Sequence, residues 1–209
     1  MGAQALEGVR VLDLSRLLPG GFCSLLLADF GAEVLKVEDT GMGDYIRWSP
    51  PYYEGAEESS RSALFLALNR NKRSIRLNLK TDEGREVLLK LVRDYDVVLE
   101  SFRPGVLDRL GVGYEAMREV NRAIVYCAIT GYGQEGPNRD RSGHDMNYLG
   151  LGGLLGLTGE PGGPPVQAAG PRPPSSGAPS PRGRRSTAPW CRPAGRSCPR
   201  APRGCCRRA

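Results

Sequence analysis

Apolar residues follow two alternating patterns along the first 133 residues, and the patterns predict strands and helices in turn. Short apolar runs bounded by glycine and polar residues are typical of strands, whereas longer runs with apolar positions three and four apart are typical of helices. The predicted strands are GVRVLDLS (8–15), AEVLKVE (32–38), DVVLESF (96–102) and AIVYCAITGYG (123–133). The predicted helices are residues 20–31, 81–95, 103–111 and 114–121.

The segment TDEGREVLLKLVRDY (81–95) carries the clearest helix pattern. Thr81 is a good N-cap residue, acidic residues fill the first turn, and apolar positions 87, 88, 91 and 92 share one face. The segment RPGVLDRLG (103–111) predicts a shorter helix with Pro104 near its start.

Strands that alternate with helices predict an α/β fold with a mostly parallel, Rossmann-like sheet flanked by helices and joined by right-handed crossovers. We expect residues 1–170 to form this domain, as the incomplete large domain of a longer protein. Ligands of such sheets bind beyond the carboxyl ends of the strands. Those ends carry KVED, ESFRPG and TGYGQEGP, so we look for the site there.

Residues 171–209 differ abruptly from the rest of the chain. They use eight residue types only and contain no Leu, Ile, Val, Phe, Met or Tyr. Without aliphatic side chains to bury, this Arg- and Pro-rich tail is predicted to be disordered. Two origins are open: a natural basic arm, or loss of the reading frame near Gly170 in a GC-rich gene. The abrupt switch favours loss of the frame.

The tail also explains the formal net charge of +6. It holds ten Arg and no acidic residue, whereas residues 1–170 hold 19 basic and 23 acidic residues. The basic balance therefore does not indicate a specific nucleic-acid-binding fold. No run approaches the ~18 apolar residues of a membrane span, and the N-terminus is not typical of a secretory signal, so we expect no membrane contact and a cytoplasmic location.

The cysteines do not indicate a metal site. Cys23 and Cys127 lie in apolar runs and are predicted to be small buried side chains, and the four tail cysteines form no C-x-x-C pair. The chain also lacks G-x-G-x-x-G after the first strand, a P-loop and G-x-S-x-G. These absences argue against standard dinucleotide-binding, P-loop and α/β-hydrolase sites.

Three segments carry candidate binding chemistry, each with a plain structural alternative. NRNKRSIRLNLK (69–80) is either a cationic surface for a phosphorylated ligand or a charge-protected edge strand, and the strict alternation of SIRLNLK (74–80) favours the edge strand. In ESFRPGV (100–106), Arg103 and a helix start form an anion site, or Glu100 and Arg103 form a local ion pair. The glycine loop TGYGQEGP (130–137) either approaches a ligand closely or is an ordinary turn.

His144 is the chain's only histidine and stands in SGHDMNYLGLGG (142–153). A histidine is suited to general acid–base chemistry at neutral pH. Its neighbour Asp145 need not orient it, because adjacent helical residues do not face each other. On the residues alone, the structural interpretation of a lone histidine is the favoured one.

Taken together, LADFGAEVLKVE, GMGDYIRW, NRNKRSIRLNLK, DVVLESFRPGV, RLGVGYEAM, IVYCAITGYGQEGP and SGHDMNYLGLGGLLGLTG occur in an order and at a spacing that resemble the class III CoA-transferase family, of the CaiB/BaiF type. The resemblance covers roughly residues 7–169. Within the family, GHDMNY is similar to the α-methylacyl-CoA racemase branch.

The resemblance implies a CoA thioester as substrate and no permanently bound cofactor or metal. It implies that His144 removes the proton α to the thioester carbonyl, and that Lys36 supplies a nearby charge. The other residues that it implies for CoA binding are Arg76, Leu77, Asn78, Leu79, Arg103, Gly131, Gly133, Gly143, Asp145, Met146, Asn147 and Tyr148.

Two departures from the family pattern stand out. The family's second catalytic residue is an Asp soon after a stretch like PPVQAAG (164–170), but here PRPPSSG follows and no acidic residue occurs after Glu160. Asp39 stands where the racemase branch has an Arg. The full-length family implies an interlocked homodimer, which we do not extend to this chain.

The leading functional prediction is therefore a parent enzyme that racemises 2-methylacyl-CoA thioesters, with the 209-residue chain truncated and inactive. One alternative is a CoA-transferase that moves CoA between carboxylic acids. The other is a non-catalytic CoA-binding or anion-binding fragment.

Overall fold

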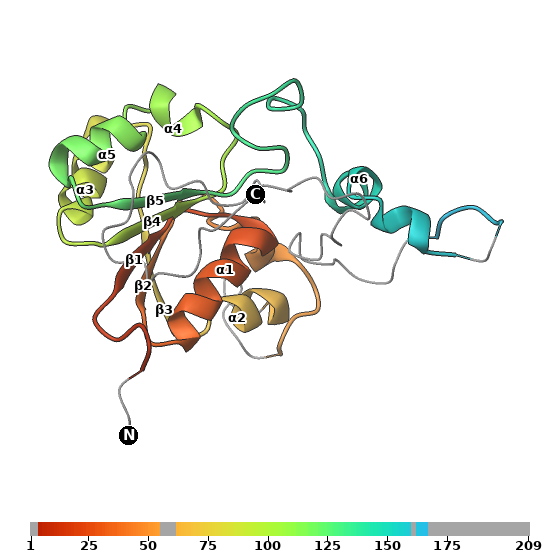
Figure 1. Cartoon of the computed structure of the whole chain (residues 1–209). Helices are drawn as coiled ribbons and strands as arrows, with labels where there is room; N and C mark the ends of the chain where they lie inside the picture. The colour runs from red at the N-terminus through yellow and green to blue at the C-terminus, as the bar shows by residue number, and fades with distance from the viewer. Residues whose placement is uncertain (1–3, 55–61, 160–161, 167–209) are drawn as a thin grey trace.

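Five parallel strands form a single sheet at the centre of the protein (Figure 1). A computed structural model describes residues 4–54, 62–159 and 162–166. The strands are β1 (Arg10–Asp13), β2 (Glu33–Glu38), β3 (Lys72–Arg76), β4 (Val97–Glu100) and β5 (Val125–Ala128). Their order is β3-β2-β1-β4-β5, which confirms the predicted α/β class and parallel sheet.

The strand order reverses its direction next to β1. From β1 the chain moves outward through β2 and β3, and it then returns to place β4 on the other side of β1. In the register, Leu12 of β1 lies opposite Leu35 of β2 and Val98 of β4. In a doubly wound sheet, the crevice beyond such a reversal is the usual ligand site.

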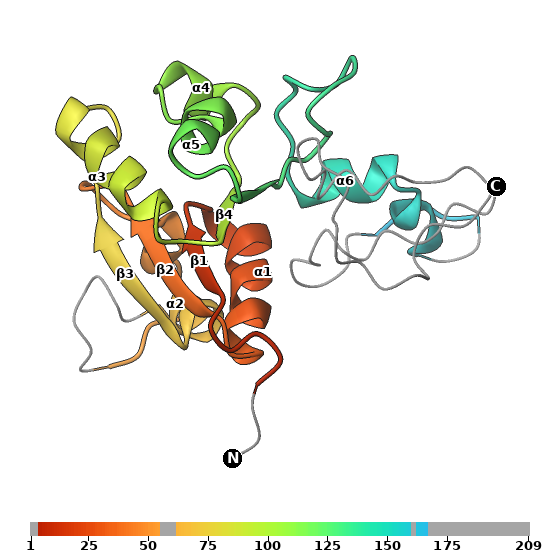
Figure 2. The same cartoon turned by 60° about the vertical axis from the view of Figure 1, so that its left-hand side comes forward.

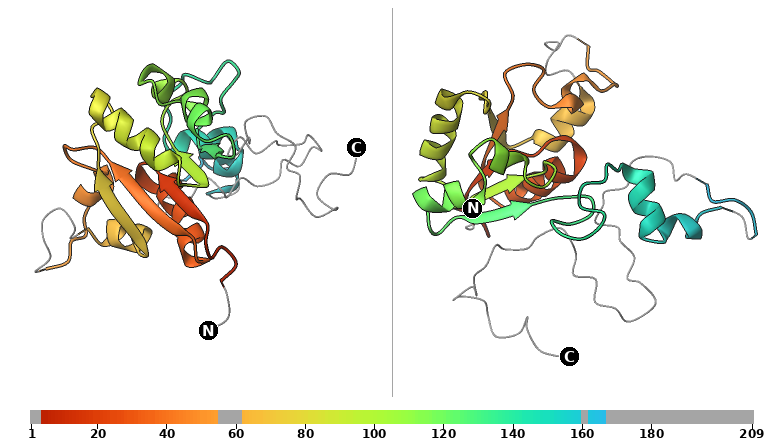
Figure 3. Two further views of the ribbon diagram at one scale, coloured as in Figure 1. Left: turned by 90° about the vertical axis from the view of Figure 1, so that its left-hand side faces the viewer. Right: turned by 90° about the horizontal axis from the view of Figure 1, so that it is seen from above.

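Helices cover both faces of the sheet. They are α1 (Leu17–Asp29), α2 (Ala63–Asn69), α3 (Asp82–Val92), α4 (Val106–Arg109), α5 (Tyr114–Val120) and α6 (Asp145–Leu151), with 3₁₀ turns η1 (Tyr45–Trp48) and η3 (Leu154–Leu157). Figure 2 and the right panel of Figure 3 show α1 and α2 on one face of the strands and α3 and α5 on the other. Helix α6 and η3 extend away from the sheet beyond β5.

Each face has its own apolar core. On one face, Leu12 and Val98 of the sheet pack against Leu88 and Val92 of α3 and Met117 of α5. Val11, Val34 and Ala28 pack beneath α1. Adjacent residues of β1 point to opposite faces, so Val11 and Leu12 are both completely buried but belong to different cores.

Helix α3 confirms the capping prediction. The Thr81 hydroxyl accepts a hydrogen bond from the Gly84 N–H at 3.2 Å. Of the four apolar positions predicted to share a face, Leu88 and Val92 are fully buried, whereas Val87 is 40% exposed. The buried stripe is therefore narrower than the apolar pattern.

Strand β3 is at the edge of the sheet, as predicted, but it ends at Arg76, so most of the alternating run 74–80 follows the strand. Arg73 pairs with Glu33 at 2.7 Å on the exposed surface. Lys72 differs, because its side chain is buried and its Nζ donates to Ser24 Oγ at 2.7 Å. Burial lowers the pKa of Lys72 to about 8, although the nearby Asp13 carboxylate opposes that shift.

Strand β5 is also an edge strand, and Val125 is 51% exposed within its apolar run. Two local expectations are corrected by the structure. Helix α4 begins at Val106, after Gly105 adopts a left-handed backbone with φ +77°, and not at Pro104. Cys23 and Cys127 are half-buried and not fully buried.

Helix α2 and η1 were absent from the sequence prediction. Ser62 caps α2 by accepting from the Phe65 N–H, and Asp44 caps η1 by accepting from the Ile46 N–H. The predicted tail, 171–209, lies outside the described residues, so its expected disorder stays a prediction. No helix of the described chain is long and apolar enough to be a candidate membrane span.

Candidate functional site

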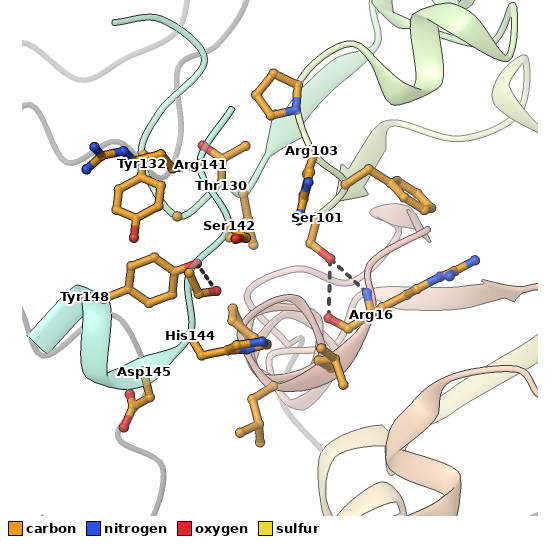
Figure 4. A pocket seen from close by; sticks show the side chains of 18 of the residues that line it. Arg16, Ser101, Arg103, Thr130, Tyr132, Arg141, Ser142, His144, Asp145 and Tyr148 are labelled. Carbon is orange, nitrogen blue, oxygen red and sulfur yellow. Dashed lines mark hydrogen bonds between the residues drawn. The ribbon is translucent and has the colours of Figure 1, made fainter. Parts of the chain in front are cut away.

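A pocket of about 580 Å³ opens at the carboxyl ends of β1, β4 and β5 (Figure 4). It therefore lies at the reversal of strand order, where a doubly wound fold is expected to bind ligands. Its lining residues come from the start of α1, the loops that follow β4 and β5, and the entry to α6. These residues are Arg16, Leu17, Leu18, Pro19, Ile46, Ser49, Leu64, Ser101, Phe102, Arg103, Pro104, Ile129, Thr130, Gly131, Tyr132, Arg139, Arg141, Ser142, Gly143, His144, Asp145 and Tyr148.

The first wall of the pocket is the turn between β1 and α1. The Arg16 N–H donates to Ser101 Oγ at 2.9 Å, which links this turn to the loop after β4. The Arg16 guanidinium lies over the Phe102 ring at 5.2 Å and pairs with Asp39 at 3.2 Å. Asp39, which stands where the racemase branch has an arginine, therefore restrains Arg16 at the rim of the pocket.

The opposite wall is built on two tyrosines and two glycines. The rings of Tyr132 and Tyr148 meet edge to face at 5.3 Å, and Tyr148 Oη donates to the Gly143 carbonyl at 2.7 Å. A Cβ on Gly131 would come within 2.5 Å of Tyr148 Cζ, and a Cβ on Gly143 within 2.9 Å of Tyr148 Cε1. Only glycine allows these two loops to pack this closely against the tyrosine.

His144 lines the pocket as the residue before α6. Its backbone N–H donates to Asn147 Oδ1 at 2.9 Å, which closes the first turn of the helix. Figure 4 shows its imidazole pointing across the pocket toward α1, while the Asp145 carboxylate points away. The expectation that Asp145 does not orient His144 agrees with this arrangement.

Arg103 is the arginine that points into the pocket (Figure 4). Within residues 4–54, 62–159 and 162–166, no carboxylate pairs with it. Its charge acts on Tyr148: burial raises the pKa of that phenol, the neighbouring Tyr132 adds to the rise, and Arg103 opposes it. An unpaired guanidinium that faces a pocket is suited to bind an anion.

Further arginines lie around the same loop. A Cβ on Gly105 would be 3.6 Å from Arg109 Nη1 and 3.7 Å from Arg139 Nη2, so the two guanidiniums flank one turn. Neither they nor Arg141 pair with a carboxylate of the described chain. The sequence analysis did not select Arg109, Arg139 or Arg141. Arg139 and Arg141 are distant from Arg103 in the sequence and reach its loop only through the fold.

Glu100 is buried at the carboxyl end of β4, directly below the Arg103 loop. It accepts a hydrogen bond from the Phe102 N–H at 2.7 Å and another from the Tyr126 side chain. Burial raises the pKa of Glu100 to about 7, even though these two hydrogen bonds oppose the rise. No ion pair joins Glu100 to Arg103 in the described chain, so that alternative is wrong. The predicted helix start is too early, because Arg103 precedes the first residue of α4 by three positions.

The raised pKa of Glu100 predicts a pH-dependent stability. The unfolded chain ionises this carboxyl near pH 4.5 and the folded chain near pH 7. The contribution of Glu100 to the free energy of unfolding is therefore fully present below pH 4.5 and is lost as the pH rises to 7. At pH 8 we expect Glu100→Gln to have a higher urea midpoint than the wild type, and a free energy of unfolding larger by on the order of 2–3 kcal/mol. At pH 4 we expect the two proteins to have the same midpoint. Equal urea midpoints at pH 8 would contradict the burial, and Glu119→Gln on the exposed surface is the control.

Lys36 is not placed as expected. Its side chain is 1% exposed, its Nζ lies 3.0 Å from Asp44 Oδ2, and it donates to the Ser15 carbonyl at 3.0 Å. It does not line the pocket, because alternation along β2 places it on the same face of the sheet as Val34, which packs against α1. The expected contact of Lys36 with CoA is therefore not supported. Lys36 instead contacts the backbone of Ser15, in the turn that forms one wall of the pocket.

The remaining candidates divide between the pocket and its surroundings. Arg103, Gly131, Gly143, His144, Asp145 and Tyr148 line the pocket. Gly133 closes the glycine loop by donating to Thr130 Oγ1, while Met146 and Asn147 lie on α6 outside the lining. Arg76 is the last residue of β3, and Leu77, Asn78 and Leu79 follow it. None of the four lines the pocket: β3 lies two strands from β1 in the sheet, and Arg76 reaches the Gly41 carbonyl at 3.5 Å.

Residues that could hold a metal ion are not clustered in the described segments: no group of three or more His, Cys, Asp or Glu is present there. The pocket instead combines arginines, one histidine, hydroxyl groups and apolar side chains. This set is suited to an organic ligand that carries both anionic and apolar parts.

Comparisons with known proteins agree with the geometry. A family model described as CoA-transferase family III matches residues 6–172. The chain is 45% identical over 165 residues to a succinate–glutarate CoA-transferase of Agrobacterium fabrum, and 44% identical over 163 residues to a succinyl-CoA:glutarate CoA-transferase of Homo sapiens. These matches cover 78% of this chain but 41% and 36% of those relatives, so the chain spans about two fifths of their length.

A solved structure gives the same result. The crystal structure of a CAIB/BAIF family protein from Brucella suis matches with a TM-score of 0.74 and 41% identity, over 80% of this chain and 44% of that chain. The pocket at the strand reversal, the family model and this structural match lead to one conclusion: the chain belongs to the class III CoA-transferase family.

Proposed function

We propose that the protein from which this sequence derives is a CoA-transferase that moves CoA between carboxylic acids. The observation that carries the proposal is the pocket at the strand reversal, with an inward-facing Arg103 and further unpaired arginines beside it. The phosphates of CoA require cations, and the thioester requires a drier pocket with hydrogen-bonding groups. The relatives named above, which are CoA-transferases, support this alternative over the racemase prediction.

The relatives also support a class of acyl group. The names of the two transferases contain succinate and glutarate, both dicarboxylates. A dicarboxylate that is bound as its thioester keeps one free carboxylate. We propose dicarboxylyl-CoA as the substrate class, because this pocket offers more than one arginine to an anionic ligand.

Each group has a proposed role. Arg103, with Arg109 and Arg139 around Gly105, binds the phosphates, and Arg76 to Leu79 bind the adenosine end. His144 donates a hydrogen bond at the thioester, and the Gly131 and Gly133 loop allows the pantetheine arm to approach closely. A homodimer of the full-length protein is part of the proposal, supported by the exposed side chains of Phe22 and Leu26 on α1 and of Phe30 directly after it.

Binding of CoA by the 209-residue chain tests the proposal. Titration calorimetry is expected to show binding of CoA and succinyl-CoA, and binding of pantetheine, which lacks the phosphates, roughly 100-fold weaker. Affinity for CoA is expected to fall with salt concentration. Equal affinity for CoA and pantetheine would contradict the phosphate role, and no binding of either would overturn the proposal.

The racemase interpretation has one observation in its favour, the His144 imidazole that faces the pocket. Transfer and racemisation differ in D₂O, because only a racemase exchanges the α proton of a 2-methylacyl-CoA. We expect no deuterium in that position after incubation with the chain, and no CoA transfer either, since PRPPSSG stands where the family pattern has its Asp. Deuterium incorporation that is lost in His144→Gln would favour the racemase.

A further inference from the structure

The turn that begins the pocket wall has an unusual backbone. Leu17 has φ +62°, in the left-handed region that a leucine rarely adopts. It is the first residue of α1, and Leu17, Leu18 and Pro19 all line the pocket. A leucine stays in this conformation only where its surroundings hold it there.

A buried ion pair holds the turn from inside the protein. Lys36 Nζ and Asp44 Oδ2 are 3.0 Å apart, and both side chains are 1% exposed. Lys36 donates to the Ser15 carbonyl at 3.0 Å, and Asp44 Oδ1 accepts from the Leu17 N–H at 3.2 Å. The pair thus binds the turn on both sides of Arg16.

Ser101 holds the same turn from the side of β4. Its hydroxyl accepts from the Arg16 N–H at 2.9 Å, and it lies 3.3 Å from the Arg16 carbonyl, to which it donates. Figure 4 shows this contact between the turn and the loop that carries Arg103. Consecutive backbone groups of residues 15 to 17 are therefore bound by side chains of three different segments.

We propose that the buried Lys36–Asp44 pair is a positioning device for the ligand pocket. It forces Leu17 into the left-handed conformation and so places the apolar start of α1 opposite His144. Lys36 and Asp44 are positioning residues that do not touch the ligand. This role goes beyond the proposed function, and only its affinity readout rests on that function.

A buried ion pair could also serve stability alone, so the test separates position from stability. Removing one partner would leave an uncompensated buried charge, whereas replacing both with apolar residues is often tolerated. The K36M/D44L variant removes both charges and both hydrogen bonds to the turn. The K36M/D44N variant removes the charges but keeps an acceptor for the Leu17 N–H.

Two measurements are made on each 209-residue variant. Amide hydrogen exchange reports the hold on Leu17 directly and needs no ligand, with the Leu12 amide of β1 as an internal reference. Calorimetry reports the affinity for succinyl-CoA. We expect K36M/D44L to exchange the Leu17 amide at least tenfold faster and to bind succinyl-CoA about tenfold more weakly, and K36M/D44N to recover most of both.

Leu17→Gly is expected to restore the ligand affinity that K36M/D44L loses, which would not happen if the ion pair served stability alone. Glycine adopts positive φ readily, so the turn no longer needs to be held. In the L17G background, K36M/D44L is expected to change affinity less than twofold. The matched control is E115Q/R118M, which removes one charge of each sign from α5, outside the pocket, and should change neither readout.

The outcomes separate the two proposals. If K36M/D44L leaves the Leu17 amide protected, or if it weakens binding equally in both backgrounds, the positioning role is wrong. If the Leu17 amide loses its protection but the wild type binds neither CoA nor succinyl-CoA, the proposed function fails while the hold on the turn is confirmed. Faster exchange with unchanged affinity overturns the link between the turn and the pocket.

Discussion

Replacement of Arg103 by methionine is expected to weaken the binding of CoA thioesters roughly 10- to 100-fold, as measured by calorimetry. Arg103 points into the pocket and pairs with no carboxylate of the described chain, so its charge is available to a ligand. Methionine keeps most of the aliphatic length and removes the guanidinium. The loss therefore measures the charge and its hydrogen bonds.

The salt dependence distinguishes a direct contact from a distant charge effect. If Arg103 binds a phosphate or carboxylate, the affinity of Arg103→Met should fall less steeply with salt than that of the wild type. Arg118→Met is the control, because Arg118 pairs with Glu115 on α5 outside the pocket. A variant that binds CoA as tightly as the wild type would show that Arg103 does not contact the ligand.

Gly131→Ala is expected to disrupt the pocket and to lower the melting temperature. The added methyl group would come within 2.5 Å of Tyr148 Cζ, so the ring must move away from Tyr132 and from the Gly143 carbonyl. Overpacking of this kind costs about 1–3 kcal/mol of stability. Loss of the wall formed by Tyr148 should also weaken succinyl-CoA binding by roughly tenfold or more.

Gly156→Ala is the matched control for that substitution. A Cβ on Gly156 meets no atom within 4 Å, so the same chemical change in η3 should leave binding unchanged. Circular dichroism confirms that the Gly131 variant is folded before its affinity is compared. Wild-type affinity in a folded Gly131→Ala protein would show that the Tyr148 wall does not contribute to the site.

Much of the fold could be predicted from the sequence because its signals are local. The cap of Thr81 and the apolar face of α3 act within a few residues. The differences arise where the apolar pattern carries no information. The apolar content of β5 says nothing about its edge position, and the left-handed Gly105 delays α4 by an amount that periodicity does not reveal.

The candidate site was predicted in part for the same reason. The rule that ligands bind beyond the carboxyl ends of strands selected Arg103, Gly131 and the loops around them, and these residues line the pocket. The rule selects positions on the chain and does not give side-chain direction. Lys36 precedes such an end and turns inward to Asp44, whereas Arg139 is far from any strand and reaches the pocket through its loop.

The sequence by itself determined the α/β class, the parallel strands and the family resemblance, and through that resemblance it predicted a role for His144. Each follows from periodicity or from motifs whose order is preserved along the chain. The tertiary structure alone decided which charges are available to a ligand. Lys36 and Arg103 have similar charges in sequence, but one is enclosed with a carboxylate beneath the turn and the other faces an open pocket. Burial and pairing are properties of three-dimensional neighbours, which distant segments supply only once the sheet has formed.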